Sequence, residues 1–254
     1  NGDAPVWKLW CIRSSILKKN INLKIDRHIH NVIIATGIGS VTTQLLTIRE
    51  FLSLLNGNEF VIAVILFNWL FLGGLGTLLA GPLSKNVKNV SLKKFYWISI
   101  FLVILAPVQL IAIRKLYSLI FIHGSSIGFY PTFAYTFFSI APYSLLLGFI
   151  LPYSLIVIRN QINNYPGTKV YIFDNIGDVC GGAIFSFILV YYTTPLQAVF
   201  LGHLPLLVAL YLLYDSAYND KSTAFFGFAL GLLVLLISVY AEIPSLTPPN
   251  GELA

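Results

Sequence analysis

The chain has 254 residues, of which 57% are hydrophobic and only 10% are charged, and its mean hydropathy is +0.79. This balance excludes an ordinary soluble domain and predicts an integral membrane protein. The formal net charge of +6 is explained by where the basic residues lie relative to the membrane, and no nucleic-acid-binding module is evident.

Residues 1–30 form a basic segment ahead of the first apolar stretch. Within it, apolar residues recur at helical spacing, namely Val6, Leu9, Ile12 and Ile16. This pattern predicts an interfacial helix lying on anionic lipid. A frayed basic tail is the alternative.

Seven apolar stretches follow, each about long enough to cross a hydrocarbon layer of roughly 30 Å as a helix. Unpaired backbone groups are costly in lipid and no alternating strand pattern appears, so the stretches are predicted to be α-helices. We expect an all-α, polytopic membrane bundle over residues 31–241, with spans near 31–55, 60–83, 95–113, 134–158, 170–192, 195–214 and 223–241.

Two further stretches are not expected to cross the membrane. Residues 116–133 are apolar but interrupted by Gly124, Gly128 and Pro131, which predicts a re-entrant or surface-lying piece. Residues 242–254 are rich in proline, which predicts a semi-extended C-terminal linker.

The basic residues are distributed unequally between the two sides of the predicted bundle. Most of the 16 lysines and arginines fall in the N-terminal segment and in the loops on its side. The positive-inside rule therefore predicts a cytoplasmic N-terminus and, with seven spans, an outside C-terminus. We expect a multi-pass protein of a prokaryotic inner (plasma) membrane.

The fifth predicted span carries polar residues at membrane depth. Asp174 and Asp178 are four residues apart and share a helix face, and Tyr171 and Asn175 form a second such pair beside them. Ionisable groups at this depth are costly and by default mark a functional site. Asp178 lies roughly 13 Å inward from the cytoplasmic end, whereas Asp174 is shallower and has the alternative of an interface residue.

A second cluster of polar residues lies at the end of the first span. Gln44, Arg49 and Glu50 lie inside the helix, Glu59 follows the turn, and Asn68 lies in the second span. By depth, Gln44 and Asn68 approach the level of Asp178, whereas Arg49 lies near the outer face and is expected to pair with Glu50 or Glu59. The sharper hypothesis is a polar track closed at the outside by these charges. The alternative is a set of interhelical hydrogen bonds.

Small residues recur at four-residue spacing in the second and fifth spans. Such patterns let helix backbones approach closely, and packing is the favoured role. The glycines concerned are Gly73, Gly76, Gly81, Gly177, Gly181 and Gly182.

The sequence predicts no cofactor, no metal site and no catalytic motif. A membrane haem would need two histidines at matching depth, and only His203 lies well inside a span. No Walker-type loop, nucleophile elbow or H-E-x-x-H motif occurs. Enzymatic activity of this chain is therefore left undecided.

Four stretches, "TTQLLTIREFLSLLNGNE", "LFNWLFLGGLGTLLAG", "GFILPYSL" and "VYIFDNIGDVCGGAIFSFILV", resemble the membrane part of spermidine synthase-like multi-pass proteins. The resemblance implies a transporter-like bundle, similar to half of a major-facilitator transporter, that precedes a soluble aminopropyltransferase-like domain. By position it carries over to Gln44, Arg49, Glu50 and Tyr171, and to the glycines of the fifth span. This sequence departs from the family in lacking the soluble domain.

Three functional hypotheses follow. The first is a transporter-like bundle that anchors a partner domain or subunit and has a polar path for a small cation such as a polyamine. The second is a structural accessory subunit of a larger membrane complex. The third is the anchor half of a membrane-bound aminopropyltransferase. The partners expected are the lipid membrane, other membrane subunits or a soluble C-terminal domain, and no nucleic acid.

Overall fold

The fold was obtained as a computed structural model that describes residues 6–55, 59–85, 90–122, 127–161 and 165–246. Every long element in these ranges is a helix, and no strand occurs in them. The helices are α1 (Val6–Leu54), α2 (Glu59–Lys85), α3 (Leu92–Ile120), α4 (Phe129–Gln161), α5 (Gly167–Ile184), α6 (Val190–Tyr192), α7 (Pro195–Tyr218) and α8 (Lys221–Leu246). A π-helical turn, η2 (Phe185–Leu189), joins α5 to the short α6.

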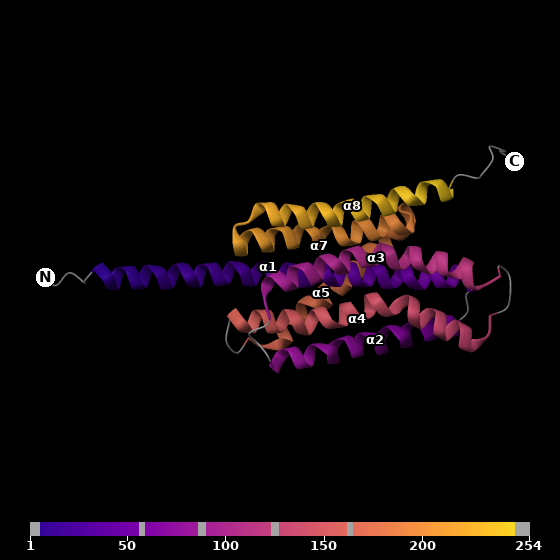
Figure 1. The fold of residues 1–254 in the computed structure, drawn as a ribbon, viewed down its shortest axis with the longest axis horizontal. Coiled ribbons are helices and arrows are strands. Elements are labelled where there is room, and N and C mark those ends of the chain that lie inside the picture. Colours follow the sequence, from indigo (N-terminus) through magenta and orange to yellow (C-terminus); the bar gives the residue numbers. More distant parts are fainter. Residues whose placement is uncertain (1–5, 56–58, 86–89, 123–126, 162–164, 247–254) are drawn as a thin grey trace.

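Seven helical stretches in the described residues are long and apolar enough to cross a membrane, which confirms the predicted polytopic all-α bundle. They run over Arg27–Leu54, Glu59–Pro82, Leu92–Ile120, Phe129–Asn160, Gly167–Tyr192, Pro195–Tyr218 and Lys221–Glu242. Because their number is odd, the two ends of the bundle sequence lie on opposite sides, as Figure 1 shows for the start of α1 and the end of α8.

Several boundaries differ from the sequence-based expectation. The prediction of a re-entrant piece over 116–133 is wrong where the structure describes it, since α3 continues to Ile120 and α4 begins at Phe129. Pro131 lies in the first turn of α4, where a proline removes no helical hydrogen bond. The predicted limits of each span were those of its apolar stretch. The helices themselves extend beyond these stretches, because backbone hydrogen bonding continues through the flanking residues.

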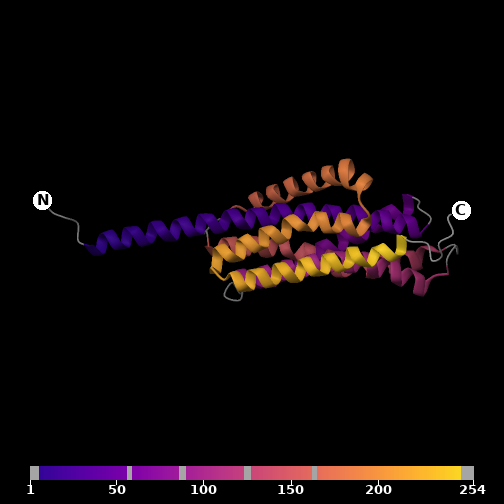
Figure 2. The ribbon, with the colours of Figure 1, turned by 90° about the horizontal axis from the view of Figure 1, so that it is seen from above.

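The N-terminal segment also differs from the expectation of a separate helix lying on the lipid surface. The backbone is helical without interruption from Val6 to Leu54, and its first part extends beyond the other helices (Figures 1 and 2). Residue 30 is therefore no helix boundary. Residues 1–5 of that predicted segment, and 247–254 of the predicted linker, lie outside the described residues.

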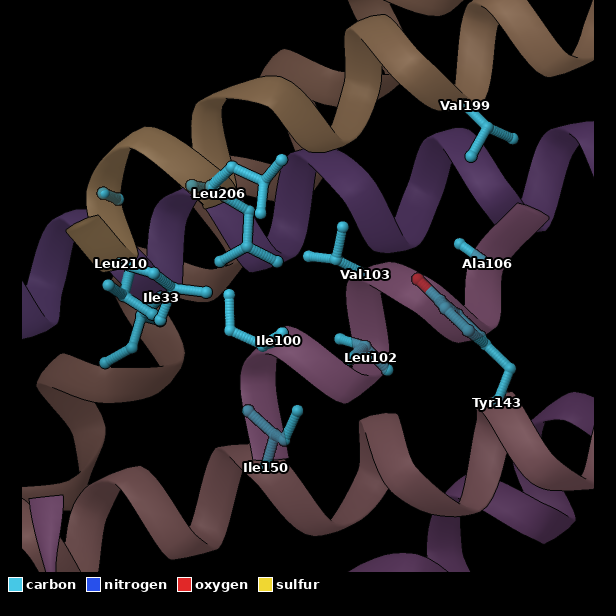
Figure 3. Packing of buried hydrophobic residues seen from close by; sticks show 14 of the residues in the cluster. Ile33, Ile100, Leu102, Val103, Ala106, Tyr143, Ile150, Val199, Leu206 and Leu210 are labelled. Carbon is cyan, nitrogen blue, oxygen red and sulfur yellow. The ribbon is translucent and has the colours of Figure 1, made fainter. Parts of the chain in front are cut away.

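The core of the bundle lies between α1, α3, α4 and α7. Helix α3 is central, and Leu102, Val103 and Ala106 on it are fully buried. Figure 3 shows these side chains among apolar residues of the neighbouring helices, including Ile33 from α1 and Leu206 from α7. Burial of this kind makes the interior a close-packed solid in which a cavity is an exception.

Helix α5 stands apart from this core. It packs mainly on α1, with few contacts to α4. In the most apolar part of the span Gly167–Tyr192, which begins with α5, only 22% is buried, against 61% in that of Arg27–Leu54. Figure 2 shows it as the orange helix set to one side of the bundle. Helix α2 is likewise peripheral and packs mainly on α4. The bundle therefore has two outlying helices, α2 and α5, each attached to a different inner helix.

Candidate functional site: an acidic cavity between α1, α2, α4 and α5

Glycines determine how closely α5 approaches α1. A Cβ atom added at Gly177 would lie 2.2 Å from the carbonyl oxygen of Ile34, and one at Gly181 would lie 2.8 Å from the backbone of Ile38. On the facing helix, a Cβ at Gly37 would lie 2.7 Å from the carbonyl oxygen of Asp174. Real Cβ atoms do not make such contacts, so only glycine permits this crossing. The crossing brings the acidic face of α5 against the middle of α1.

Asp178 receives a hydrogen bond across this crossing. The Ser40 hydroxyl lies 3.3 Å from Oδ1 of Asp178 and 2.8 Å from the carbonyl oxygen of Gly37. A hydroxyl group has a single hydrogen, so Ser40 divides it between these two acceptors. The Asp178 carboxyl group therefore keeps most of its hydrogen-bonding capacity for something else.

Both acids line a cavity of about 200 Å³ between four helices. Its remaining polar lining comes from Thr36, Ser40 and Gln44 on α1, Thr77 on α2 and Ser144 on α4, and Trp69, Gly73 and Gly148 are among its other walls. Among the described residues, the lining contains two carboxyl groups and no basic side chain. The cavity is therefore an acidic, partly open site between the four helices.

Within the residues that the structure describes, no ion pair neutralises these carboxyl groups. In the part of the chain that the structure describes, the recorded salt bridges both involve Arg114, which pairs with other acids. Two ionised carboxyl groups at membrane depth without a counter-charge carry a large desolvation cost. The cavity consequently favours an occupant that is positively charged or that delivers protons.

Ser144 is a buried polar residue beside the cavity. Its side chain is fully buried, it lines the cavity, and its hydroxyl group has no hydrogen-bond partner within the described residues. Buried hydroxyl groups in native proteins are almost always hydrogen-bonded to protein, water or ligand.

The structure brings together some of the residues predicted for a polar track and separates others. Gln44, Asp174 and Asp178 line the same cavity. Asn68 is fully buried but is not among the lining residues, and its side-chain amide donates to Thr136 Oγ1 at 2.9 Å. Asn175 is exposed on the outer side of α5. The middle of the expected track is therefore a cavity that excludes Asn68, and Asn175 of the predicted polar cluster also lies outside it.

The charges expected at the outer boundary, near the end of α1, are also arranged differently from the expectation. Arg114 at the end of α3 binds both carboxylate oxygens of Glu50, at 2.8 and 2.7 Å, and reaches Glu242 at 3.2 Å. Arg49 and Glu59 are exposed, and Arg49 forms no ion pair in the described ranges. The pairing expected between Arg49 and Glu50 is thus replaced by a bidentate pair between Arg114 and Glu50.

Glu242 links the last helix to this outer cluster. It was expected to begin a Pro-rich linker, but α8 continues to Leu246 and Glu242 is buried. Its second carboxylate oxygen accepts hydrogen bonds from the Thr194 hydroxyl at 2.6 Å and from the backbone N–H of Leu196 at 3.2 Å. The carboxylate therefore also serves the N-terminus of α7, whose free N–H groups favour a negative charge.

The glycines of α2 fall into two groups. A Cβ at Gly76 would lie 2.2 Å from the carbonyl oxygen of Leu145, and one at Gly148 would lie 2.1 Å from that of Gly73. A Cβ at Gly73 or Gly81 would meet nothing within 4 Å, and one at Gly182 in α5 would make an ordinary contact of 3.6 Å. Of the glycines predicted to serve packing, close contact therefore depends on Gly76, Gly177 and Gly181, and it depends as well on Gly37 in α1 and Gly148 in α4.

Sequence reasoning missed several residues of the site. Thr36 and Ser40 precede Gln44 at four-residue intervals, so a polar stripe along the first span could have been found. Ser144 and Trp69 gave no such signal, because each is an isolated residue in an apolar stretch.

The fold and the site together define a multi-pass α-helical membrane protein with a partly open acidic cavity between its helices. Comparison of the chain with protein-family models, with curated proteins and with solved structures gives no match. What the protein does therefore has to be inferred from its own residues.

Proposed function

We propose that the protein is a transporter-like membrane bundle that binds a small cation in the cavity beside Asp174 and Asp178. The observation that carries this proposal is the composition of the lining, which has two carboxyl groups and no base. A cation bound there would offset the desolvation cost of both acids. The Gln44 side chain, which also lines the cavity, is available for a further polar contact.

The outer cluster of Arg114, Glu50 and Glu242 supports a closed outer end. These three side chains join α1, α3 and α8, and Glu242 adds the start of α7 through Thr194. A path for a cation would have to open this cluster or avoid it. The outer gate first ascribed to Arg49 and Glu50 is thus better ascribed to Arg114 with Glu50 and Glu242.

The proposed role in an assembly rests on the resemblance to spermidine synthase-like proteins and on the peripheral position of α5. Under it, the bundle anchors a soluble aminopropyltransferase-like domain or another membrane subunit. The exposed apolar side of α5, with Ile172, Ile176 and Val179, is available to lipid or to a partner helix. Co-purification with a partner in fixed proportion would favour the alternative role of an accessory subunit.

Direct cation binding by the purified protein in lipid nanodiscs tests the proposal. Rubidium and n-butylammonium ions serve as probes, and Asp178→Asn is compared with the parent. A hydrogen bond to a charged group is worth about 1.5–3 kcal/mol, so we expect an affinity loss of about tenfold or more. Glu59→Gln, which removes an exposed acid outside the cavity, should leave affinity unchanged.

The result that would overturn the proposal is equally specific. Unchanged affinity for both probes in Asp178→Asn and in Asp174→Asn would show that the acids hold no cation. Absence of binding to the folded parent protein would have the same consequence.

A further inference from the structure

An aromatic side chain forms one wall of the acidic cavity. Trp69 on α2 lines it and is only 7% exposed. Its indole ring packs on the ring of Tyr143 from α4, with centroids 5.8 Å apart. The indole is thus supported from behind, and the cavity combines carboxyl groups from α5 with an aromatic surface from α2.

The volume of the cavity favours an organic occupant over a bare ion. An engineered cavity of roughly 150 Å³ is large enough to bind benzene, and this one measures about 200 Å³. A single inorganic ion would leave most of that space to water. A molecule of several carbon and nitrogen atoms would fill it and would also cover the apolar part of the lining, which includes Leu147, Ile150 and Leu151.

Two hydroxyl groups of the lining, those of Thr36 and Thr77, are arranged to accept hydrogen bonds. Thr36 donates its hydrogen to the carbonyl oxygen of Val32 at 2.8 Å, and Thr77 donates to the carbonyl oxygens of Gly73 and Gly148 at 3.1 and 3.0 Å. With their hydrogens committed, both oxygens have only lone pairs to offer. An ammonium group has three N–H donors and no acceptor, which complements such a lining.

The described residues contain no group of three or more His, Cys, Asp and Glu side chains that could hold a metal ion. A divalent hard cation would seek more charged oxygen ligands than the two carboxyl groups available. A tryptophan face, by contrast, attracts organic cations, and more strongly where water is excluded.

We infer that the cavity is a site for a primary organic ammonium ion, with Asp174 and Asp178 accepting its N–H groups and Trp69 covering its alkyl part. This inference rests on the proposed cation site and adds its chemical class. In this site, Trp69 is the residue that determines specificity for organic cations. The polyamines expected from the sequence belong to the same class of cation.

Substitution of Trp69 tests the inference in nanodisc-embedded protein, with affinities for n-butylammonium and rubidium measured by calorimetry. We expect Trp69→Leu to weaken n-butylammonium binding about tenfold, which corresponds to about 1.4 kcal/mol, and to leave rubidium binding within about twofold. Trp69→Phe keeps an aromatic ring and should retain most of the affinity. Trp97→Leu, which removes a tryptophan that is absent from the cavity lining, is the matched control.

The possible outcomes separate this inference from the proposed function. If rubidium binds as well as n-butylammonium and Asp178→Asn abolishes both, while Trp69→Leu affects neither, the cation site stands and the organic specificity is overturned. If the folded parent binds neither probe, both proposals are overturned. Helical circular dichroism and a single gel-filtration peak establish that each variant is folded.

Discussion

Replacement of Gly177 by alanine tests whether glycine contacts hold the acidic helix in place. The added Cβ atom would lie 2.2 Å from the carbonyl oxygen of Ile34 and 3.1 Å from Cα of Gly37, whereas ordinary van der Waals contact begins at 3.4 Å. Both obstacles are backbone atoms and cannot rotate away. Helix α5 must therefore move away from α1 by roughly 1 Å, which breaks close packing along the whole crossing.

The expected cost is in the upper part of the range for overpacked sites, about 2–3 kcal/mol. Reversible unfolding in mixed detergent micelles measures it, and the displacement should also weaken cation binding because the Ser40 and Asp178 side chains separate. Gly74→Ala is the matched control, since a Cβ there meets nothing within 4 Å and alanine is the better helix former. Equal stability of the two variants would refute the steric reasoning.

Two further predictions concern charged groups. Arg114→Ala leaves the buried carboxylates of Glu50 and Glu242 without their cation and should lower the free energy of unfolding by about 3 kcal/mol. A double variant that adds Glu50→Gln should recover part of this loss. Full stability of the single variant would show that the cluster does not hold this end of the bundle together. Asp220 lies between the last two spans, and hydrogen bonds from Thr223 lower its pKa. The contribution of the Asp220 carboxylate to the stability of the fold is therefore complete above the ordinary pKa of about 4. It is lost as the pH falls through the lowered pKa. Between about pH 5 and 2, the melting temperature of Asp220→Asn should fall less than that of the parent, and identical pH profiles would contradict this assignment.

The number and type of spans could be predicted because apolar length is a strong signal for membrane helices. Their ends could not, since polar residues continue the same helices. Glu242 illustrates the difficulty: it begins a polar, proline-containing tail in the sequence, yet it lies in α8 and is buried against Arg114.

The candidate site could be predicted in part. Helical spacing correctly put Asp174 and Asp178 on one face, and depth placed Gln44 at a similar level. The rotation of α2 could not be inferred, because nearly all of its residues are apolar. Asn68 and Trp69 are adjacent in the sequence, yet only Trp69 lines the cavity.

The position of Glu242 has a consequence for biosynthesis. The chain is made from its N-terminus, so Glu50 and Arg114 enter the membrane before α8 exists. Until α8 arrives, the start of α7 lacks the carboxylate that accepts from Thr194 and Leu196. Insertion of the seventh span thus completes this end of the bundle, and a nascent bundle without it would leave these polar groups unsatisfied.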